Sequence, residues 1–301
     1  MAQTFPVKPV RIIVGTAAGG GVDAISRIVG AKLGERWPHA VVVENRAGAG
    51  GAVGSEFVAK SAPDGHTLLT ISIAHAVIPT SHRNLGYDPA RDLVPITVLV
   101  NAPNVLTVHP SLPARNLKEL LALGKARPGD IQYASSGNGA PAHLAGELLK
   151  LLTGVSFTHV PYKGTSPAMT DLIGGRVSFA FSSIISSVPH AKAGKLRLLA
   201  ATGGKRAASL PDLPTMAEAG VAGYAVDVWY AMLAPAATPR TVLTTINGEV
   251  ARELRATAMR DRLAEIGLEP VADGLEPTAR YIDAEMAKWG KVARAAGITA
   301  Q

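Results

Sequence analysis

Four glycine- and serine-rich elbows stand out in this sequence, each placed between an apolar, strand-like run and a helix-like pattern. They cover residues 15–23, 45–51, 135–139 and 162–166. Such an elbow exposes the first amide N–H groups of the following helix, which have no acceptor within the helix and lie at the positive end of its dipole. Each elbow can therefore hold an anion, and four together are typical of a binding site for a small acid.

The composition narrows the class of partner. With 301 residues, of which 47% are apolar and 18% charged, the chain is long enough for two α/β lobes, and no apolar run approaches the roughly 20 residues of a membrane span. The net charge of +7 favours anionic partners. Because Lys and Arg are scattered and few aromatic residues stand among them, we expect small anions and no nucleic acid. The absence of Cys excludes disulfides, zinc–thiolate sites and a thiol nucleophile.

Motifs for cofactors and catalysis do not fit the first elbow. Its glycines at 15, 19, 20 and 21 lack the G-x-G-x-x-G spacing of dinucleotide-binding loops, and Val22 stands where a phosphate loop carries Ser or Thr. Neither G-x-S-x-G nor S-x-x-K occurs, so we expect no catalytic residue and no cofactor. The alternative is a soluble enzyme that uses a nucleotide or an acyl-phosphate and cradles the phosphate with residues 15–23.

Three groups of polar residues have structural interpretations. His143 and Glu147 stand four residues apart on a helix, but no third ligand is evident, so we expect no metal site. Arg46 is expected to pair with Glu44 and its neighbours. Asp23 either contacts the ligand or caps and orients its elbow.

Strand-like and helix-like segments, which must position the elbows, alternate along the chain. This alternation favours mostly parallel sheets flanked by helices. Strands are expected at 10–14, 41–43, 67–73, 104–108, 131–134, 156–159, 177–181, 196–201 and 227–234. Residues 209–223, which are rich in Pro and Gly, predict a surface loop with a short helix. The closing helix has an apolar stripe from Leu275 to Ala293.

The order of these elements predicts two lobes. Too few strands follow residue 235 for a separate sheet, so the chain is expected to return to the first lobe. We predict a first lobe of residues 1–103 plus 235–301 and a second lobe of 104–234, joined by two hinge crossings. Ligands of such sheets bind beyond the carboxyl ends of the strands, so the elbows are expected to surround one interlobe cleft.

Eight motifs together closely resemble the Bug family, the periplasmic solute receptors of tripartite tricarboxylate transporters, over essentially the whole chain. They are residues 9–14, 18–23, 43–51, 62–69, 133–139, 159–164, 210–215 and 287–291. The resemblance implies a two-lobed, type II-like periplasmic binding fold that closes on a small carboxylate. It implies delivery of that carboxylate to a membrane permease. A receptor that reports to a sensor protein is the alternative, and we expect a monomer.

The resemblance also assigns ligand-binding residues. In the family the elbow that matches residues 16–23 holds the ligand largely through ordered waters, the loops that match 135–140 and 164–165 clamp a carboxylate, and the strand end at 72–75 adds contacts. The predicted set is Thr16, Ala18, Gly19, Gly20, Asp23, Ser72, His75, Ser135, Gly137, Asn138, Ala140, Tyr162, Gly164, Thr165 and Ser182.

One departure from the family pattern bears on the ligand. Many relatives carry an acidic residue where this chain has Ser182 and Ser183, and an ammonium group would need that anion. We therefore predict a carboxylate without an amine, such as a dicarboxylate, a hydroxy acid or an aromatic acid. The family further implies an exported precursor, a periplasmic location and a mature start at Ala2 and Gln3 after an added Met1.

Overall fold

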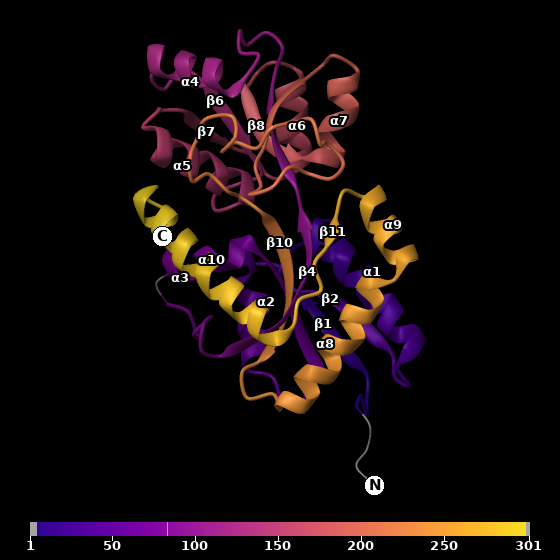
Figure 1. Cartoon of the computed structure of the whole chain (residues 1–301). Coiled ribbons are helices and arrows are strands. Elements are labelled where there is room, and N and C mark those ends of the chain that lie inside the picture. The colour runs from indigo at the N-terminus through magenta and orange to yellow at the C-terminus, as the bar shows by residue number, and fades with distance from the viewer. Residues whose placement is uncertain (1–4, 83, 299–301) are drawn as a thin grey trace. The chain divides into compact units, whose positions relative to one another are not determined.

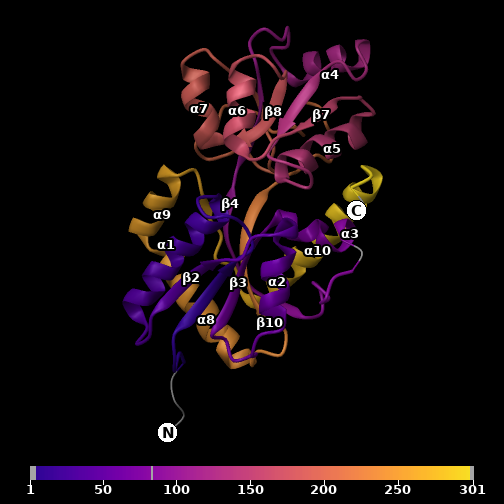
Figure 2. The ribbon, with the colours of Figure 1, turned by 180° about the vertical axis from the view of Figure 1, so that it is seen from behind.

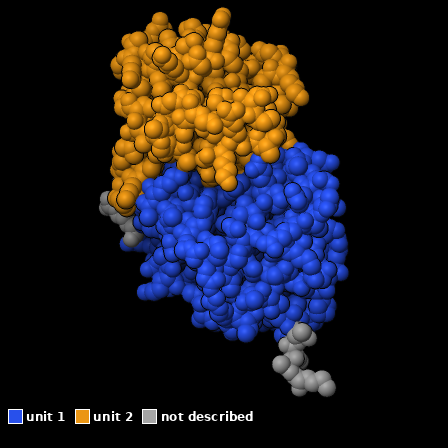
Figure 3. Space-filling view, viewed as in Figure 1, with its two compact units in different colours: residues 1–101, 229–290, 299–301 blue, residues 102–228, 291–298 orange. Residues whose placement is uncertain are grey.

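The computed structural model describes residues 5–82 and 84–298, so the predicted mature start at Ala2 and Gln3 lies outside the described part. The chain divides into two compact units, one with residues up to 101 and 229–290, the other with residues 102–228 and 291–298 (Figure 3). Each unit is built on one helix-flanked sheet, which confirms the predicted α/β class. The predicted lobe boundaries stay a prediction.

The sheet of the first unit has the strand order β11-β4-β10-β3-β1-β2 (Figures 1 and 2). Its strands are β1 (Val10–Val14), β2 (Val41–Asn45), β3 (Thr67–Ser72), β4 (Leu93–Ala102), β10 (Val228–Pro235) and β11 (Glu269–Pro270). Strand β1 pairs in parallel with β2 and β3. Ile12, Ile13 and Val14 are fully buried, as expected for a strand covered on both faces.

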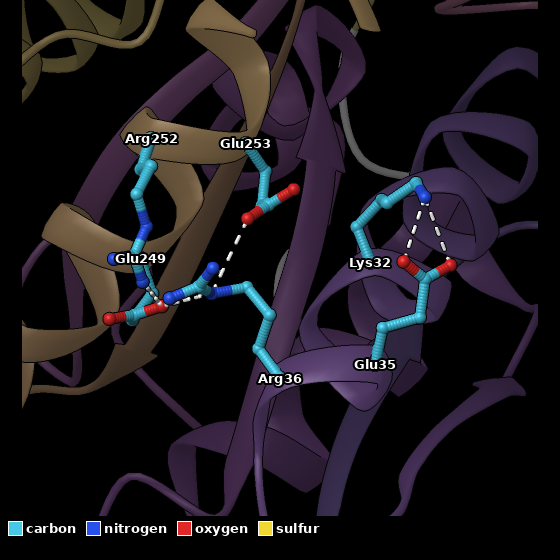
Figure 4. A network of polar contacts seen from close by, with 6 residues as sticks. All are labelled: Lys32, Glu35, Arg36, Glu249, Arg252 and Glu253. Carbon is cyan, nitrogen blue, oxygen red and sulfur yellow. Dashed lines mark hydrogen bonds and ion pairs between the residues drawn. The ribbon is translucent and has the colours of Figure 1, made fainter.

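Helices cover this sheet. They are α1 (Gly21–Arg36), the 3₁₀ turn η1 (Ala49–Gly51), α2 (Ala52–Ala59), the 3₁₀ turn η2 (Ile73–Val77), α3 (Ile78–Ser81), α8 (Arg240–Arg255), α9 (Thr257–Glu265) and α10 (Leu275–Ala295). Helices α1 and α8 lie side by side, and Arg36 links them through Glu249 at 3.0 Å and Glu253 at 3.4 Å (Figure 4). Glu249 also pairs with Arg252. These pairs are half-exposed, so they contribute little to stability.

The sheet of the second unit has the order β7-β6-β8-β5-β9. Its elements are β5 (Asn104–Val108), α4 (Leu117–Ala126), β6 (Gln132–Ser135), α5 (Pro141–Thr153), β7 (Thr158–Pro161), α6 (Thr165–Ile173), β8 (Phe179–Ser183), α7 (Ile184–Lys192) and β9 (Arg197–Ala201). Strand β6 pairs in parallel with β7 and β8, whereas β5 runs antiparallel to β8 and β9. Tyr133, Phe179 and Leu172 are fully buried in this unit.

Three details differ from the sequence prediction. The sheets are mixed and not mostly parallel, because β10 enters the first sheet antiparallel to β3 and β5 enters the second antiparallel to β8. Strand β4 was not predicted. Residues 209–223 form turns and a bridge from Thr215 to Ala201 in place of a short helix. Pro211 and Pro214 lack the N–H groups that a helix needs. None of the described helices combines the length and the apolar character that crossing a membrane requires.

Candidate functional site

The first elbow lies where β1 ends and α1 begins. Gly19 has φ 86°, a conformation that glycine adopts without strain. Gly20 precedes the helix in an extended conformation, and no side-chain hydrogen bond caps this end of α1 within the described chain. The first-turn amides of α1 are therefore open to an anion. Ala18, Gly19 and Gly20 are exposed, as a ligand contact through the backbone requires.

The side chain of Asp23 is buried and hydrogen-bonds to the backbone of this elbow. Its buried carboxylate accepts hydrogen bonds from Gly19 N at 2.9 Å, Arg27 Nε at 3.1 Å and Asn45 Nδ2 at 3.0 Å. The Asn45 amide also donates to the Thr16 carbonyl at 3.0 Å. The hydrogen bond from Arg27, with further help from Gly19 and Asn45, lowers the pKa of Asp23 to about 2. Both carboxylate oxygens thus have partners, Oδ2 in the elbow itself and Oδ1 on β2, which matches the orienting role considered for Asp23.

A small hollow opens behind the elbow, with a volume of about 20 Å³, room for about one water molecule. It is lined by Gly15, Thr16, Val22, Gly50, Gly51, Ser55, Leu69, Thr70, Ile71, Ser72, His75 and Ile78. Three buried polar atoms among these residues, Thr16 Oγ1, Thr70 Oγ1 and His75 Nε2, have no hydrogen-bond partner in the described structure. Buried polar atoms are almost always paired, so this cluster is suited to a polar guest.

His75 is a neutral group of this hollow. Its side chain is 3% exposed, and burial lowers its pKa to about 4. Nδ1 lies 3.4 Å from Ser55 Oγ, and Nε2 is the ring nitrogen that has no hydrogen-bond partner among the described residues. The Ser72 hydroxyl accepts from Ala74 N at 3.3 Å and so caps η2.

The structure therefore brings three predicted residues, Thr16, Ser72 and His75, to one hollow. Sequence reasoning missed Thr70 and Ser55, which share it. The available signal was Thr70 itself, a hydroxyl between the apolar residues Leu69 and Ile71 in the middle of the strand. The structural role predicted for Arg46 is confirmed. Its Nε lies 2.6 Å from Glu44 Oε1, and its Cζ lies 3.6 Å from the centre of the Phe57 ring.

The elbows of the second unit lie together at one edge of its sheet. Because β6 and β7 are parallel neighbours, their carboxyl ends are adjacent, and Tyr162 N donates to the Ser135 carbonyl at 2.9 Å. Gly137 and Gly164 have φ values of 138° and 118°. Helix α6 starts after Gly164 without a side-chain cap among the described residues, so its first amides are open. The exposed Asn138, together with Ala140 and Thr165, belongs to the same edge.

Two predicted side chains at this edge have internal partners. Ser135 Oγ accepts from Gly137 N at 3.1 Å and lies 2.6 Å from His159 Nε2. The Tyr162 hydroxyl donates to Asp171 Oδ2 at 2.8 Å. These contacts hold the elbows in shape and leave backbone groups for a ligand.

Ser182 lies in a buried hydroxyl cluster at the end of β8. Its Oγ is 2.7 Å from Ser187 Oγ and 3.2 Å from Thr107 Oγ1, and the residue is 6% exposed. The neighbouring Ser183 accepts from Ser186 N and caps α7. A ligand role for Ser182 stays a prediction.

The described His, Asp and Glu side chains do not form a metal-binding cluster. Within residues 5–82 and 84–298, no three His, Cys, Asp or Glu side chains gather as a ligand set. His143 instead accepts a hydrogen bond from Gly139 N at 3.0 Å.

Comparison with known proteins places the chain beside transport receptors. Residues 25–298 match the model of the tripartite tricarboxylate transporter family receptor. The chain is 36% identical over 298 residues to protein BugT of Bordetella pertussis, covering 98% of this chain and 91% of BugT.

Solved structures agree with this match. Rpa4515 of R. palustris, solved with adipate, is 38% identical, with a TM-score of 0.86 over 99% of this chain and 100% of that one. MatC (Rpa3494) from Rhodopseudomonas palustris, solved with bound malate, is 30% identical, with a TM-score of 0.81 over 96% of this chain and 99% of that one.

Proposed function

The chain belongs to the receptor family of tripartite tricarboxylate transporters, the Bug family, and from this we propose that it captures a small carboxylate that carries no amine group. The ligand classes are dicarboxylates, hydroxy acids and aromatic acids. Adipate in Rpa4515 and malate in MatC support the first two classes.

The observation that carries this proposal is the hollow behind the first elbow. It is lined by Val22 of the uncapped first turn of α1, and three of its buried polar atoms, Thr16 Oγ1, Thr70 Oγ1 and His75 Nε2, are unpaired. The amides of this turn favour a negative charge, and the unpaired atoms favour an ordered water or a carboxylate oxygen beside it. A water of this kind costs little entropy and bridges ligand and protein nearly as well as a direct hydrogen bond.

The state of Asp23 supports a ligand without an amine. An ammonium group would need an anionic partner, and Asp23 is the acidic residue of the first elbow. Its carboxylate is already engaged by Gly19, Arg27 and Asn45. An amino-acid ligand would therefore leave its ammonium poorly compensated.

The location of the protein and the fate of its bound ligand are inferred from the family. A solved relative is a periplasmic binding protein, and we place this receptor in the periplasm as well. We propose that it closes on its carboxylate and delivers it to the membrane permease of a tripartite transporter, or reports it to a sensor protein.

Isothermal titration calorimetry with adipate, malate, benzoate and aspartate tests the proposal. We expect one binding site for at least one of the first three acids, no binding of aspartate and recovery of the acid unchanged. Occupancy at 100 times Kd should also add about 2.7 kcal/mol to the free energy of unfolding. Chemical conversion of the acid, or saturable binding of ATP or NAD in place of the acids, would favour the enzyme alternative.

A pair of variants ties binding to the hollow. The double change Thr16→Val and Thr70→Val removes two hydroxyls at nearly constant volume, and we expect affinity to fall about tenfold, a loss of about 1.4 kcal/mol. Thr97→Val is the matched control, because Thr97 is equally buried but donates to Val98 and Asp273 carbonyls away from the hollow. It should lower stability and leave affinity unchanged.

A further inference from the structure

Two histidines of the second unit stack face to face beneath an elbow. The ring centroids of His143, on α5, and His159, on β7, lie 3.9 Å apart with an interplanar angle of 7°. His143 is 7% exposed, and the ring of Tyr133 stacks on His159 at 5.0 Å. One aromatic stack thus joins the helix that follows the elbow of residues 135–139 to the strand that leads into the elbow of residues 162–166.

A nitrogen of each ring contacts the elbow of residues 135–139. His143 Nδ1 accepts from Gly139 N at 3.0 Å, and His159 Nε2 lies 2.6 Å from Ser135 Oγ. Ser135 Oγ in turn accepts from Gly137 N at 3.1 Å. The pair therefore fixes both the beginning and the end of this elbow.

This arrangement requires a neutral His143. Gly139 N–H is a donor, so Nδ1 must offer a lone pair, and a proton on Nδ1 would set two donors against each other. Burial lowers the pKa of His143, and burial together with the neighbouring His143 lowers the pKa of His159 to about 4. Both rings are therefore uncharged at neutral pH.

Some charged groups around the pair favour a protonated histidine ring and others disfavour it. Glu147 Oε1 lies 3.8 Å from His143 Nε2 and favours a charged ring, but it already accepts from Tyr133 at 2.8 Å and Lys150 at 2.9 Å. Lys150 disfavours a charged ring. Tyr224 donates to the Ala145 carbonyl of α5 at 3.0 Å and is neutral, because burial raises its pKa.

We propose that His143 and His159 are positioning residues for the elbow of residues 135–139. They hold it as neutral rings, and the hydrogen bond from Gly139 N is lost when His143 takes a proton. This inference rests on the proposed function for its consequence, namely that the receptor binds its carboxylate less tightly in acid. Neither ring needs to touch the ligand, because both act through Gly139 and Ser135.

The first test needs no ligand. In protein labelled with ¹³Cε1-histidine and ¹⁵N-glycine, NMR spectra are recorded from pH 8 to pH 4. We expect the Gly139 amide to shift together with the His143 ring signal, below the usual range of histidine. In His143→Asn the side-chain oxygen can replace Nδ1 as acceptor, so the Gly139 amide should keep its pH 8 position throughout. A Gly139 amide that ignores the titration of His143, or that is unmoved in His143→Ala, would refute the positioning role.

The second test measures affinity, with adipate as the probe. Wild type, His143→Asn and His143→Ala are titrated calorimetrically at pH 8 and pH 5, and each variant is compared with wild type at the same pH so that protonation of adipate cancels. Because one hydrogen bond to the elbow is lost, we expect His143→Ala to bind about 2- to 10-fold more weakly at pH 8. His143→Asn should match wild type at pH 8 and bind more tightly than wild type at pH 5.

The outcomes separate the two proposals. Equal affinity ratios at both pH values would overturn the inference. If adipate binds at neither pH, adipate is not the ligand and the acid that binds in the calorimetric panel takes its place, while the NMR titration decides the role of His143 independently. His39→Asn is the control, because His39 is half-buried in the other unit and should keep the pH dependence of wild type.

Discussion

The indole N–H groups of Trp229 and Trp289 donate to the same carboxylate oxygen, Glu285 Oε2, at 2.8 and 2.7 Å. Both tryptophans are fully buried, and Glu285 is 7% exposed. Trp229 lies in β10 and the other two residues in α10, so one buried anion ties the closing helix to the strand by which the chain re-enters the first sheet. This contact and its full burial place Trp229 in the core of the first unit.

Replacing Glu285 should destabilise the fold. Glu285→Ala leaves two buried indole donors unpaired, so we expect a loss of about 3 kcal/mol or more in the free energy of unfolding, and about half of that for Glu285→Gln, which keeps one acceptor. Urea unfolding measures both. Glu276→Gln, on the exposed side of α10 where Glu276 pairs with Arg240, should leave the midpoint nearly unchanged. Equal midpoints for the two glutamate sites would contradict this prediction.

Asp23→Asn should destabilise the protein in a way that disappears in acid. The folded carboxyl has a pKa of about 2 against an ordinary 3.8, so its stabilisation is complete above pH 4 and is lost as pH falls through 2. We expect a loss of about 1–2 kcal/mol at pH 7 and no difference from wild type near pH 2, measured by chemical denaturation. Asp261→Asn, at an exposed position of α9, is the control. A deficit that stays constant with pH would argue against the Asp23 network.

Gly54→Ala should disturb the first elbow through its backbone. A Cβ on Gly54 would lie 2.9 Å from Gly15 Cα and 3.1 Å from the Arg46 carbonyl oxygen. We expect a loss of about 1–3 kcal/mol in stability and weaker carboxylate binding, because α2 must move away from the end of β1. Gly248→Ala in α8 meets no described atom within 4 Å and should raise stability by about 0.5–1 kcal/mol without changing affinity. Native-like affinity in Gly54→Ala would contradict the close approach.

His75 should make the protein less stable in mild acid. An unfolded histidine takes a proton near pH 6.5, whereas His75 takes one only near pH 4, so the stability it contributes above 6.5 is lost as pH falls between these values. The loss is about 3 kcal/mol for such a shift. Urea unfolding of wild type and His75→Gln at pH 8 and pH 4 measures it. We expect the wild type to lose more stability than the variant, and parallel losses would show that His75 is not the cause.

Much of the fold could be predicted because alternation of apolar strands and helices is a local signal. The spacing of apolar residues predicted both the buried strand at 10–14 and the apolar stripe of α10. Strand direction was less accessible, since β10 pairs with β3, more than 150 positions earlier in the chain, and nothing near Val228 reports its partner. The surface loop predicted at 209–223 contains turns and no helix, and its short helix was the wrong part of that prediction.

The candidate site was predictable where chemistry depends on backbone. Glycine-rich elbows mark open helix ends, so the elbows at 15–23 and 162–166 could be named from the sequence, whereas their ligand contacts stay a prediction. Side-chain partners were not predictable, because Thr70 and His159 act through groups that only the folded sheet brings near. The stack of His143 on His159 joins residues 16 positions apart on different elements, and neither shows any ligand spacing in the sequence.

The first turn of α1, which ends in peptide groups and no capping side chain, has a consequence for how such receptors diversify. Every amino acid except proline carries the same N–H, so a substitution in this turn keeps its backbone donor unless it introduces proline. For the carboxylate ligand proposed above, neighbouring side chains can then vary while the donors for its acid group stay in place.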